Sequence, residues 1–117
     1  MRRDARSFLW DVREAADAIQ EFVRGRSIAD YTRDLMLRSA VERQLGIIGE
    51  ALAQLARTDH SIAARIPETR RVVGFRNVLI HGYDRIDDAG VWRVINDDLP
   101  FLRTRVAELL NELGEAP

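Results

Sequence analysis

Apolar residues recur at spacings of three and four along most of the chain, and this period constrains the fold more than any other feature of the sequence. Between Asp4 and Arg24 the repeating positions form one face of a helix: Phe8, Leu9, Val12, Ala16, Ile19, Phe22 and Val23. Gly25 ends this helix. No segment alternates polar and apolar residues over the length of a strand, and turn-forming clusters are too sparse for a sheet protein. The sequence therefore predicts an all-α fold.

A second, long helix is predicted to start at Ser27, where a hydroxyl can accept from an open backbone N–H and Asp30 places an acid in the first turn. Its apolar stripe reaches to about Arg57 and consists of Tyr31, Leu35, Val41, Leu45, Ile48, Leu52 and Leu55. Gly46 and Gly49 interrupt its helix propensity, and paired glycines in a buried helix often mark the close approach of another backbone. We expect this helix to lie at the crowded centre of the fold or at a subunit contact.

The residues after the long helix predict a short element and then a third main helix. Residues 58–61 break the apolar pattern and are expected to cap a short turn that runs through Ile66. Pro67 follows, and the third helix is predicted over about 68–80.

The last predicted helix is capped by Asp87 or Asp88 and closed by Gly114. Pro100 removes a backbone donor near its middle, so the helix should kink or restart there. Together these elements predict an antiparallel bundle of four main helices plus a short helix, in a single domain over 1–117.

Composition excludes several classes of protein. With 117 residues and 46% hydrophobic content, the chain is large enough to bury a core without metal or disulfide staples. It contains no cysteine, so neither a disulfide framework nor a thiolate metal site is possible. No run of about 18 apolar residues is present to span a membrane, and the N-terminus continues into an amphipathic pattern rather than a signal-peptide core. We expect a cytoplasmic protein with no membrane partner.

The charge balance restricts how this chain can meet nucleic acid. Its net charge of −1 argues against coating nucleic acid by bulk electrostatics, so any contact must be local. All 18 basic residues are arginine, which suits bidentate phosphate recognition but would equally follow from a codon bias toward arginine.

Groups that can attack a phosphodiester gather in one eight-residue segment, RNVLIHGY. His81 can take and give a proton near neutral pH, Arg76 offers a permanently charged forked donor, and Asn77 adds a neutral donor and acceptor. Gly82 permits a sharp turn of the backbone before Tyr83. The same residues also fit a purely structural role, with the imidazole, phenol and guanidinium bonded to backbone carbonyls at a helix end.

The spacing of Arg76 and His81 raises a geometric problem, because positions five apart on a regular helix are rotated by about 140°. One solution places His81 at a frayed C-terminus, where Gly82 turns the chain back toward Arg76. Another brings the same segment of a second subunit across a two-fold axis. The second solution also supplies two histidines, one to accept the 2′-hydroxyl proton of RNA and one to protonate the leaving oxygen.

Other kinds of site find little support in the sequence. His60 lies in a polar turn and is interpreted as a loop residue without a role. The two histidines lack cysteines or carboxylates at ligand spacing, so we expect no metal. No glycine-rich phosphate loop and no nucleophilic serine elbow occurs.

Three blocks of the sequence together match one known family: residues 40–51 (AVERQLGIIGEA), 74–83 (GFRNVLIHGY) and 91–100 (VWRVINDDLP). The central block follows the family's pattern without departure: Arg, a polar residue, three more residues, His, any residue, then Tyr. On these residues the whole chain resembles the HepT-like toxins of the HEPN superfamily. These are small helical bacterial proteins encoded beside a minimal nucleotidyltransferase called MntA.

The resemblance implies a HEPN-like homodimer in which Arg76 and His81 of both chains line an RNA-cleaving cleft that needs no metal or cofactor. In this interpretation His81 is general base and acid, Arg76 stabilises charge developing on phosphorus, and Asn77 orients the phosphate. Glu50 is a further candidate for the cleft, because its helix glycines suggest a position near the crowded axis; a solvated acid is the alternative.

The resemblance also implies regulation, as the toxin of a type VII-like toxin–antitoxin pair. In this family the MntA-like antitoxin transfers AMP from ATP to the motif tyrosine, here Tyr83. Adenylates two residues from the histidine would place bulk and negative charge where an RNA phosphate would lie.

Two readings from other classes remain open. The chain could be a non-catalytic module that binds a nucleotide or the nucleotidyltransferase, with Arg76 and His81 holding phosphate without breaking bonds. It could also be a structural dimer with no ligand.

Overall fold

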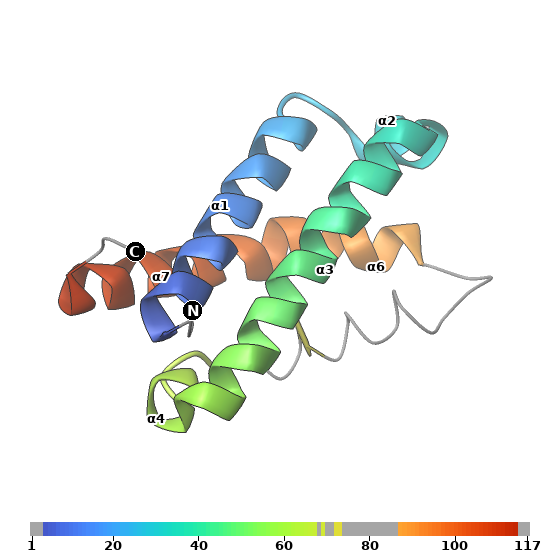
Figure 1. Cartoon of the computed structure of the whole chain (residues 1–117). Coiled ribbons are helices and arrows are strands. Elements are labelled where there is room, and N and C mark those ends of the chain that lie inside the picture. The colour runs from blue at the N-terminus through green and yellow to red at the C-terminus, as the bar shows by residue number, and fades with distance from the viewer. Residues whose placement is uncertain (1–3, 68, 70–71, 74–86, 115–117) are drawn as a thin grey trace.

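The computed structural model describes residues 4–67, 69, 72, 73 and 87–114 (Figure 1). The helices in these ranges are α1 (Ala5–Val23), α2 (Ile28–Arg33), α3 (Leu35–Thr58), α4 (His60–Ala63), α6 (Asp88–Arg93), the π-helix η1 (Val94–Asp98) and α7 (Leu99–Leu113). No strand occurs among the described residues, which confirms the predicted all-α class. None of the helices in these ranges combines the length and the apolar character needed to cross a bilayer.

The molecule is organised around a pair of helices and a rod that crosses them. Helices α1 and α3 run antiparallel side by side, and α6, η1 and α7 follow one another in a continuous rod that passes obliquely behind the pair (Figure 1). The core lies where the rod meets the pair, and its fully buried large side chains are Leu9, Ile19, Tyr31, Leu45, Ile48, Leu52, Leu55, Ile95, Leu99, Leu102, Leu109 and Leu110.

Helix α1 has the bounds that its apolar period predicts. The carboxylate of Asp4 caps it by accepting a 3.2 Å hydrogen bond from the Ser7 N–H, which satisfies one of the open donors of the first turn. At the other end Gly25 adopts a φ of +71°, a left-handed conformation that glycine adopts without steric cost. The predicted end of the helix at Gly25 is therefore confirmed.

The predicted long helix from Ser27 to Arg57 is wrong in one respect, because it is two helices. Its start is confirmed: Ser27 and Asp30 form a reciprocal capping box, with Asp30 N–H donating to Ser27 Oγ and Ser27 N–H donating to the Asp30 carboxylate. The chain then leaves the helix at Asp34, which is extended, and the Asp34 carboxylate accepts a 3.0 Å bond from Leu37 N–H to start α3. An aspartate that can cap the next helix competes with continuation of the previous one.

Gly46 does not lie in a crowded centre of this chain. A Cβ built on Gly46 would meet no heavy atom within 4 Å, apart from its own helix backbone and chain neighbours, whereas Gly49 is buried. Helix α3 itself is central, since it packs against α1, α2 and α4, but Gly46 does not mark the close approach of another backbone in this chain. The subunit-contact alternative stays a prediction.

The short turn after α3 is confirmed as α4, whose N-cap is Asp59. The predicted third helix over about 68–80 lies mostly outside the described residues. Of its positions the structure describes only Thr69, Val72 and Val73, which are helical, with Val72 buried in the core.

The predicted interruption of the last helix near Pro100 is confirmed. Asp87 caps α6 by accepting from Ala89 N–H at 3.1 Å. The π-turn η1 follows, and α7 starts at Leu99 with Pro100 in its first turn, where a missing N–H costs little. Gly114 ends α7 in the left-handed region at φ +75°, as predicted.

Two ion pairs tie α7 to other parts of the fold. Arg103 binds Asp17 of α1 in a forked contact, with Nε–Oδ1 at 2.6 Å and Nη2–Oδ2 at 3.2 Å. Arg65, just after α4, binds Glu112 near the end of α7 at 2.8 Å. All four side chains are partly exposed, so each pair contributes at most about 1 kcal/mol and acts mainly to orient α7.

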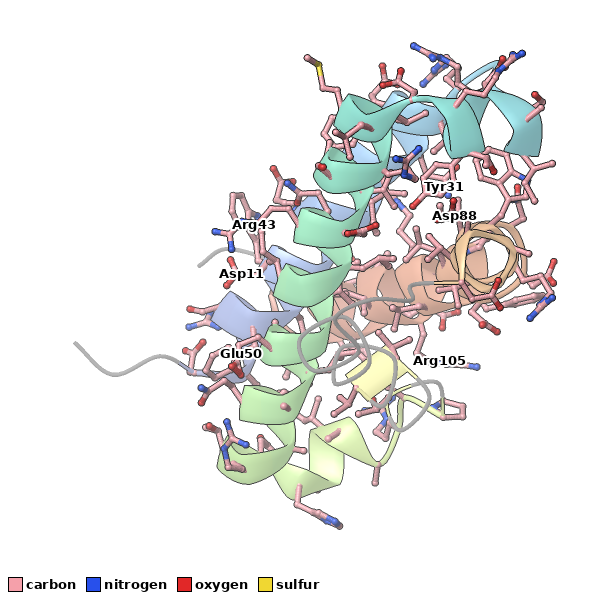
Figure 2. The ribbon with its side chains drawn as sticks, turned by 90° about the vertical axis from the view of Figure 1, so that its right-hand side faces the viewer. Asp11, Tyr31, Arg43, Glu50, Asp88 and Arg105 are labelled. Atoms are coloured by element: carbon pink, nitrogen blue, oxygen red, sulfur yellow. The ribbon has the colours of Figure 1, made fainter. Side chains whose placement is uncertain are left out.

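A polar cluster lies at the junction of α2, α3 and α6. Tyr31 is 0% exposed and stacks at a tilt on Trp92 with ring centroids 5.5 Å apart, and its hydroxyl has no hydrogen-bond partner among the described residues. Figure 2 shows Tyr31 close to Asp88. Burial raises the pKa of Tyr31, the negative charges of Glu42 and Asp88 raise it further, and Arg38 opposes them. Burial first, and Asp88 second, also raise the pKa of Glu42. We therefore expect the fold to keep its stability when the Tyr31 hydroxyl or the Glu42 charge is removed.

Replacing Tyr31 by Phe should raise the free energy of unfolding by about 1 kcal/mol, because it removes a buried hydroxyl that has no partner while keeping the ring. Chemical denaturation measures the change. Tyr31→Ala is the control for the ring itself and should lose about 3–5 kcal/mol. A clear loss of stability in Tyr31→Phe would show that the hydroxyl is satisfied in solution.

Replacing Glu42 by Gln should stabilise the fold more at neutral than at acid pH. Because the pKa of Glu42 is raised in the folded state above its usual 4.5, its favourable contribution is complete below the unfolded pKa and is lost as pH rises through the folded pKa. Glutamine is neutral at both pH values, so the variant does not lose stability as pH rises. Thermal unfolding of both proteins at about pH 4 and about pH 7 should show a gap that widens toward pH 7; an equal gap at both values would contradict the assignment.

Candidate functional site

Four of the five predicted site residues lie outside the described part of the chain. Arg76, Asn77, His81 and Tyr83 fall within residues 74–86, so their predicted roles stay predictions. The described residues on either side are Val73, which packs against the core, and Asp87, which caps α6.

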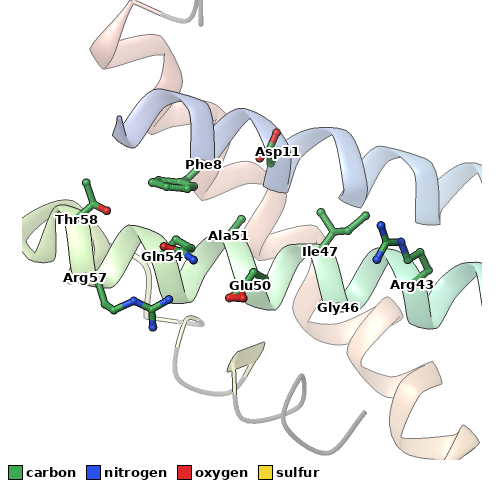
Figure 3. Close-up of a pocket in the computed structure, with 10 residues that line it drawn as sticks. All are labelled: Phe8, Asp11, Arg43, Gly46, Ile47, Glu50, Ala51, Gln54, Arg57 and Thr58. Carbon is green, nitrogen blue, oxygen red and sulfur yellow. The ribbon is translucent and has the colours of Figure 1, made fainter. Parts of the chain in front are cut away.

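Glu50, the fifth predicted site residue, is exposed on α3 and lines a groove of about 790 Å³ (Figure 3). Helix α1 contributes two of the lining residues and α3 contributes the rest: Phe8, Asp11, Arg43, Gly46, Ile47, Glu50, Ala51, Gln54, Arg57 and Thr58. The groove therefore follows the contact between the two antiparallel helices on their outer side.

The local sequence explains why these side chains share one groove. On α3 the residues Arg43, Ile47, Glu50, Gln54 and Arg57 follow one another at spacings of four and three, so they form one stripe along the helix. The core stripe of α3 is a different set: Leu37, Val41, Leu45, Ile48, Leu52 and Leu55. A helix with two such stripes buries one and leaves the other at the surface.

The charges of the groove balance. Arg43 and Arg57 supply two positive charges, and Asp11 and Glu50 supply two negative ones. Among the described residues, the side chains of Arg43, Glu50 and Arg57 make no hydrogen bond or ion pair. A groove of mixed sign is a poor general attractor for the RNA backbone, and it suits a surface that carries the complementary pattern.

A second hollow, of about 840 Å³, lies beside the end of α3 and around α4. Its lining residues are mainly apolar: Ala53, Ala56, Arg57, His60, Ala63, Ala64, Ile66, Pro67, Thr69 and Val73. His60, which the sequence assigned to a polar turn, is the exposed first residue of α4 at this hollow. The Oγ1 atom of Thr69 is buried and has no hydrogen-bond partner in the part of the chain that the structure describes.

Sequence reasoning singled out Glu50 but missed the residues that surround it. Arg43, Arg57 and Asp11 were not recognised as groove residues, although the second stripe on α3 was present in the spacing. The contribution of α1 could not be found this way, because it depends on how α1 packs against α3. No group of three or more His, Cys, Asp or Glu side chains that could hold a metal ion occurs among the residues that the structure describes.

Comparison with known proteins adds information over almost the whole length. The family model described as "Ribonuclease HepT-like" matches residues 12–109, a range that contains the segment from Arg76 to Tyr83. No solved structure matches the chain.

Several relatives of similar length carry ribonuclease descriptions. A Methanocaldococcus jannaschii protein described as "Putative RNase MJ1380" is 33% identical over 105 residues, which cover 90% of this chain and 95% of that protein. "Probable ribonuclease HepT" of Thermococcus cleftensis is 32% identical over 109 residues, covering 93% and 98%. "Putative RNase TTE0752" of Caldanaerobacter subterraneus subsp. tengcongensis is 30% identical over 107 residues, covering 92% and 95%. The all-α fold, the extent of the family match and these relatives together show that the chain belongs to the HepT-like ribonuclease family of the HEPN superfamily.

Proposed function

We propose that this protein is a metal-independent ribonuclease toxin that acts as a homodimer, with Arg76 and His81 of both chains at the cleavage site. The observation that carries the proposal is the family match over residues 12–109, which includes the uninterrupted pattern from Arg76 to Tyr83. Relatives of similar length described as RNases support the reaction class.

The chemistry assigns a role to each residue of the motif. One His81 accepts the proton of the 2′-hydroxyl as that oxygen attacks the adjacent phosphorus, and a second protonates the 5′-oxygen as the P–O bond breaks. Arg76 stabilises the negative charge that develops on the phosphoryl oxygens, and Asn77 orients the phosphate. Because both proton transfers use imidazole, the reaction needs no bound metal ion.

Regulation is proposed to act through Tyr83 and a MntA-like nucleotidyltransferase antitoxin. The phenol oxygen of Tyr83 attacks the α-phosphorus of ATP, the bond between the α-phosphorus and the bridging oxygen breaks, pyrophosphate leaves, and the phenol proton passes to solvent. The product carries AMP two residues from His81. Its bulk and negative charge exclude an RNA phosphate from the same space.

The ribonuclease proposal predicts cleavage that survives metal removal and depends on the motif. Purified protein should cut RNA at the same rate with and without EDTA, and His81→Ala and Arg76→Ala should each lower the rate roughly 100-fold or more. His60→Ala is a matched control, since His60 is the other histidine of the chain and is exposed on α4. Circular dichroism confirms that each variant is folded.

Two results would contradict this assignment. If folded His81→Ala and Arg76→Ala cut as fast as the parent, the chemistry lies elsewhere. If no variant cuts RNA but calorimetry detects AMP or ATP binding that His81→Ala abolishes, the segment is a nucleotide-binding module instead.

The regulatory proposal predicts a mass change on one tyrosine. After co-expression with a MntA-like nucleotidyltransferase, intact-mass measurement should show one or more added AMP units, and they should vanish in Tyr83→Phe. Tyr31 is the other tyrosine of the chain and is 0% exposed, so Tyr31→Phe should keep the modification. Added AMP that persists in Tyr83→Phe would place the acceptor elsewhere.

A further inference from the structure

The outward side of α3 carries a stripe of mixed apolar and charged residues. Its residues are Met36, Ala40, Arg43, Ile47, Glu50, Gln54 and Arg57, at spacings that alternate between four and three. These spacings place all seven on one line along the helix. Met36 at the start of the stripe is 81% exposed and its neighbour Leu35 is 68% exposed, so this end of α3 presents an apolar surface.

Two of the three charged residues of the stripe, Arg43 and Glu50, are placed symmetrically about its centre. Arg43 and Glu50 are seven residues apart, about 10 Å along the helix axis, and the midpoint between them falls between Gly46 and Ile47. Figure 3 shows Gly46 and Ile47 between these two charged side chains. The same midpoint divides α3 itself into equal halves, since the helix runs from Leu35 to Thr58.

A two-fold axis at this midpoint would make α3 complementary to itself. In an antiparallel pair of α3 helices, Arg43 lies opposite Glu50 of the partner subunit, and Glu50 lies opposite Arg43 of the partner subunit. Each contact is therefore made twice, as an isologous interface requires. We propose that the groove face of α3 is the homodimer interface, held by these two reciprocal ion pairs.

The centre of the stripe is shaped for close approach. Under the same symmetry Ile47 lies opposite Gly46 of the partner subunit, where a Cβ would meet no heavy atom within 4 Å in the single chain. Ile47 is half-buried against the core of its own chain, and its exposed part can occupy that open space, so that the two helix axes can reach the 8–10 Å separation typical of packed helices. The dimer would thus explain the glycine at position 46, because a larger side chain there would block Ile47 of the partner subunit.

The ends of the stripe fit as well. Met36 lies opposite Arg57 of the partner subunit, whose aliphatic stem can cover an apolar side chain while its guanidinium stays in water. Helix α3 is 24 residues, about 36 Å, so two antiparallel copies can meet over several helical turns.

This inference rests on the proposed function in one respect, because the ribonuclease was proposed to be a homodimer; it names the surface that forms the dimer. It also changes the role of Glu50. Glu50 is a residue of the subunit contact in this arrangement, instead of a residue that touches RNA.

Charge exchange tests the reciprocal pairs. Sedimentation equilibrium of the full chain should show a dimer whose dissociation constant rises roughly 100-fold or more in Arg43→Glu and in Glu50→Arg, because each reversal places two like-charged pairs in the interface. The double variant Arg43→Glu/Glu50→Arg restores opposite charges in both pairs and should return to within about tenfold of the parent. Arg105→Glu, on an exposed arginine of α7, is the control and should leave the dimer unchanged.

Three outcomes would overturn the interface: a monomeric parent, a dimer that tolerates both single reversals, or a double variant that stays monomeric. If the single reversals weaken RNA binding measured by fluorescence anisotropy while the molecular mass stays that of the dimer, the groove holds RNA instead. The ribonuclease proposal fails separately, since a dimer that follows the charge exchange but cuts no RNA would keep the interface and remove the activity.

Discussion

The antiparallel contact between α1 and α3 determines what every other part of this structure can do. It buries one stripe of α3 and leaves a second stripe at the surface, and the groove forms along the line where the two helices meet. The rod of α6, η1 and α7 closes the core from the other side, so none of the described helices covers the outer face of the pair (Figure 1). Burial is the dominant favourable term in folding, and here it also selects which charged residues stay available for contacts.

The balance of charge in the groove distinguishes a surface suited to contact with a protein from a site suited to RNA cleavage. The sequence alone had placed Glu50 with the cleavage site, yet the negative charges of Glu50 and Asp11 balance the positive charges of Arg43 and Arg57 in the groove. A surface of that kind favours a protein partner with the matching pattern. In the proposed function the chemistry of RNA cleavage belongs to the segment that carries Arg76 and His81, between the core contact of Val73 and the helix cap at Asp87.

Local signals predicted the helix ends well, because capping and glycine chemistry act over a few residues. Ser27 with Asp30, Gly25 and Gly114 all have the predicted positions. The break at Asp34 was missed, because an aspartate can equally sit on the surface of a helix and its capping bond to Leu37 is decided only when the chain turns. Crowding around Gly46 could not be judged without the neighbouring helices.

The packing of α1 against α3 in the candidate site could not be predicted from the sequence. The groove needs Phe8 and Asp11 of α1 beside Glu50 of α3, and no spacing along the sequence reports that pairing. The buried Tyr31 hydroxyl was equally hidden, because an apolar period marks the ring for burial but says nothing of the partners that its oxygen finds.

The π-turn η1 keeps the buried side chains of α6 and α7 on the same side of the rod. Val91, Ile95 and Leu99 are buried at two successive intervals of four, whereas the following buried positions Leu102 and Val106 return to intervals of three and four. A regular α-helix would let such a stripe drift around its axis, and a turn with i→i+5 bonding, here from Leu99 N–H to Val94 C=O, takes up the surplus residue. Losing a single residue from this turn would therefore rotate everything after it by about 100° and carry the apolar side of α7 away from α1.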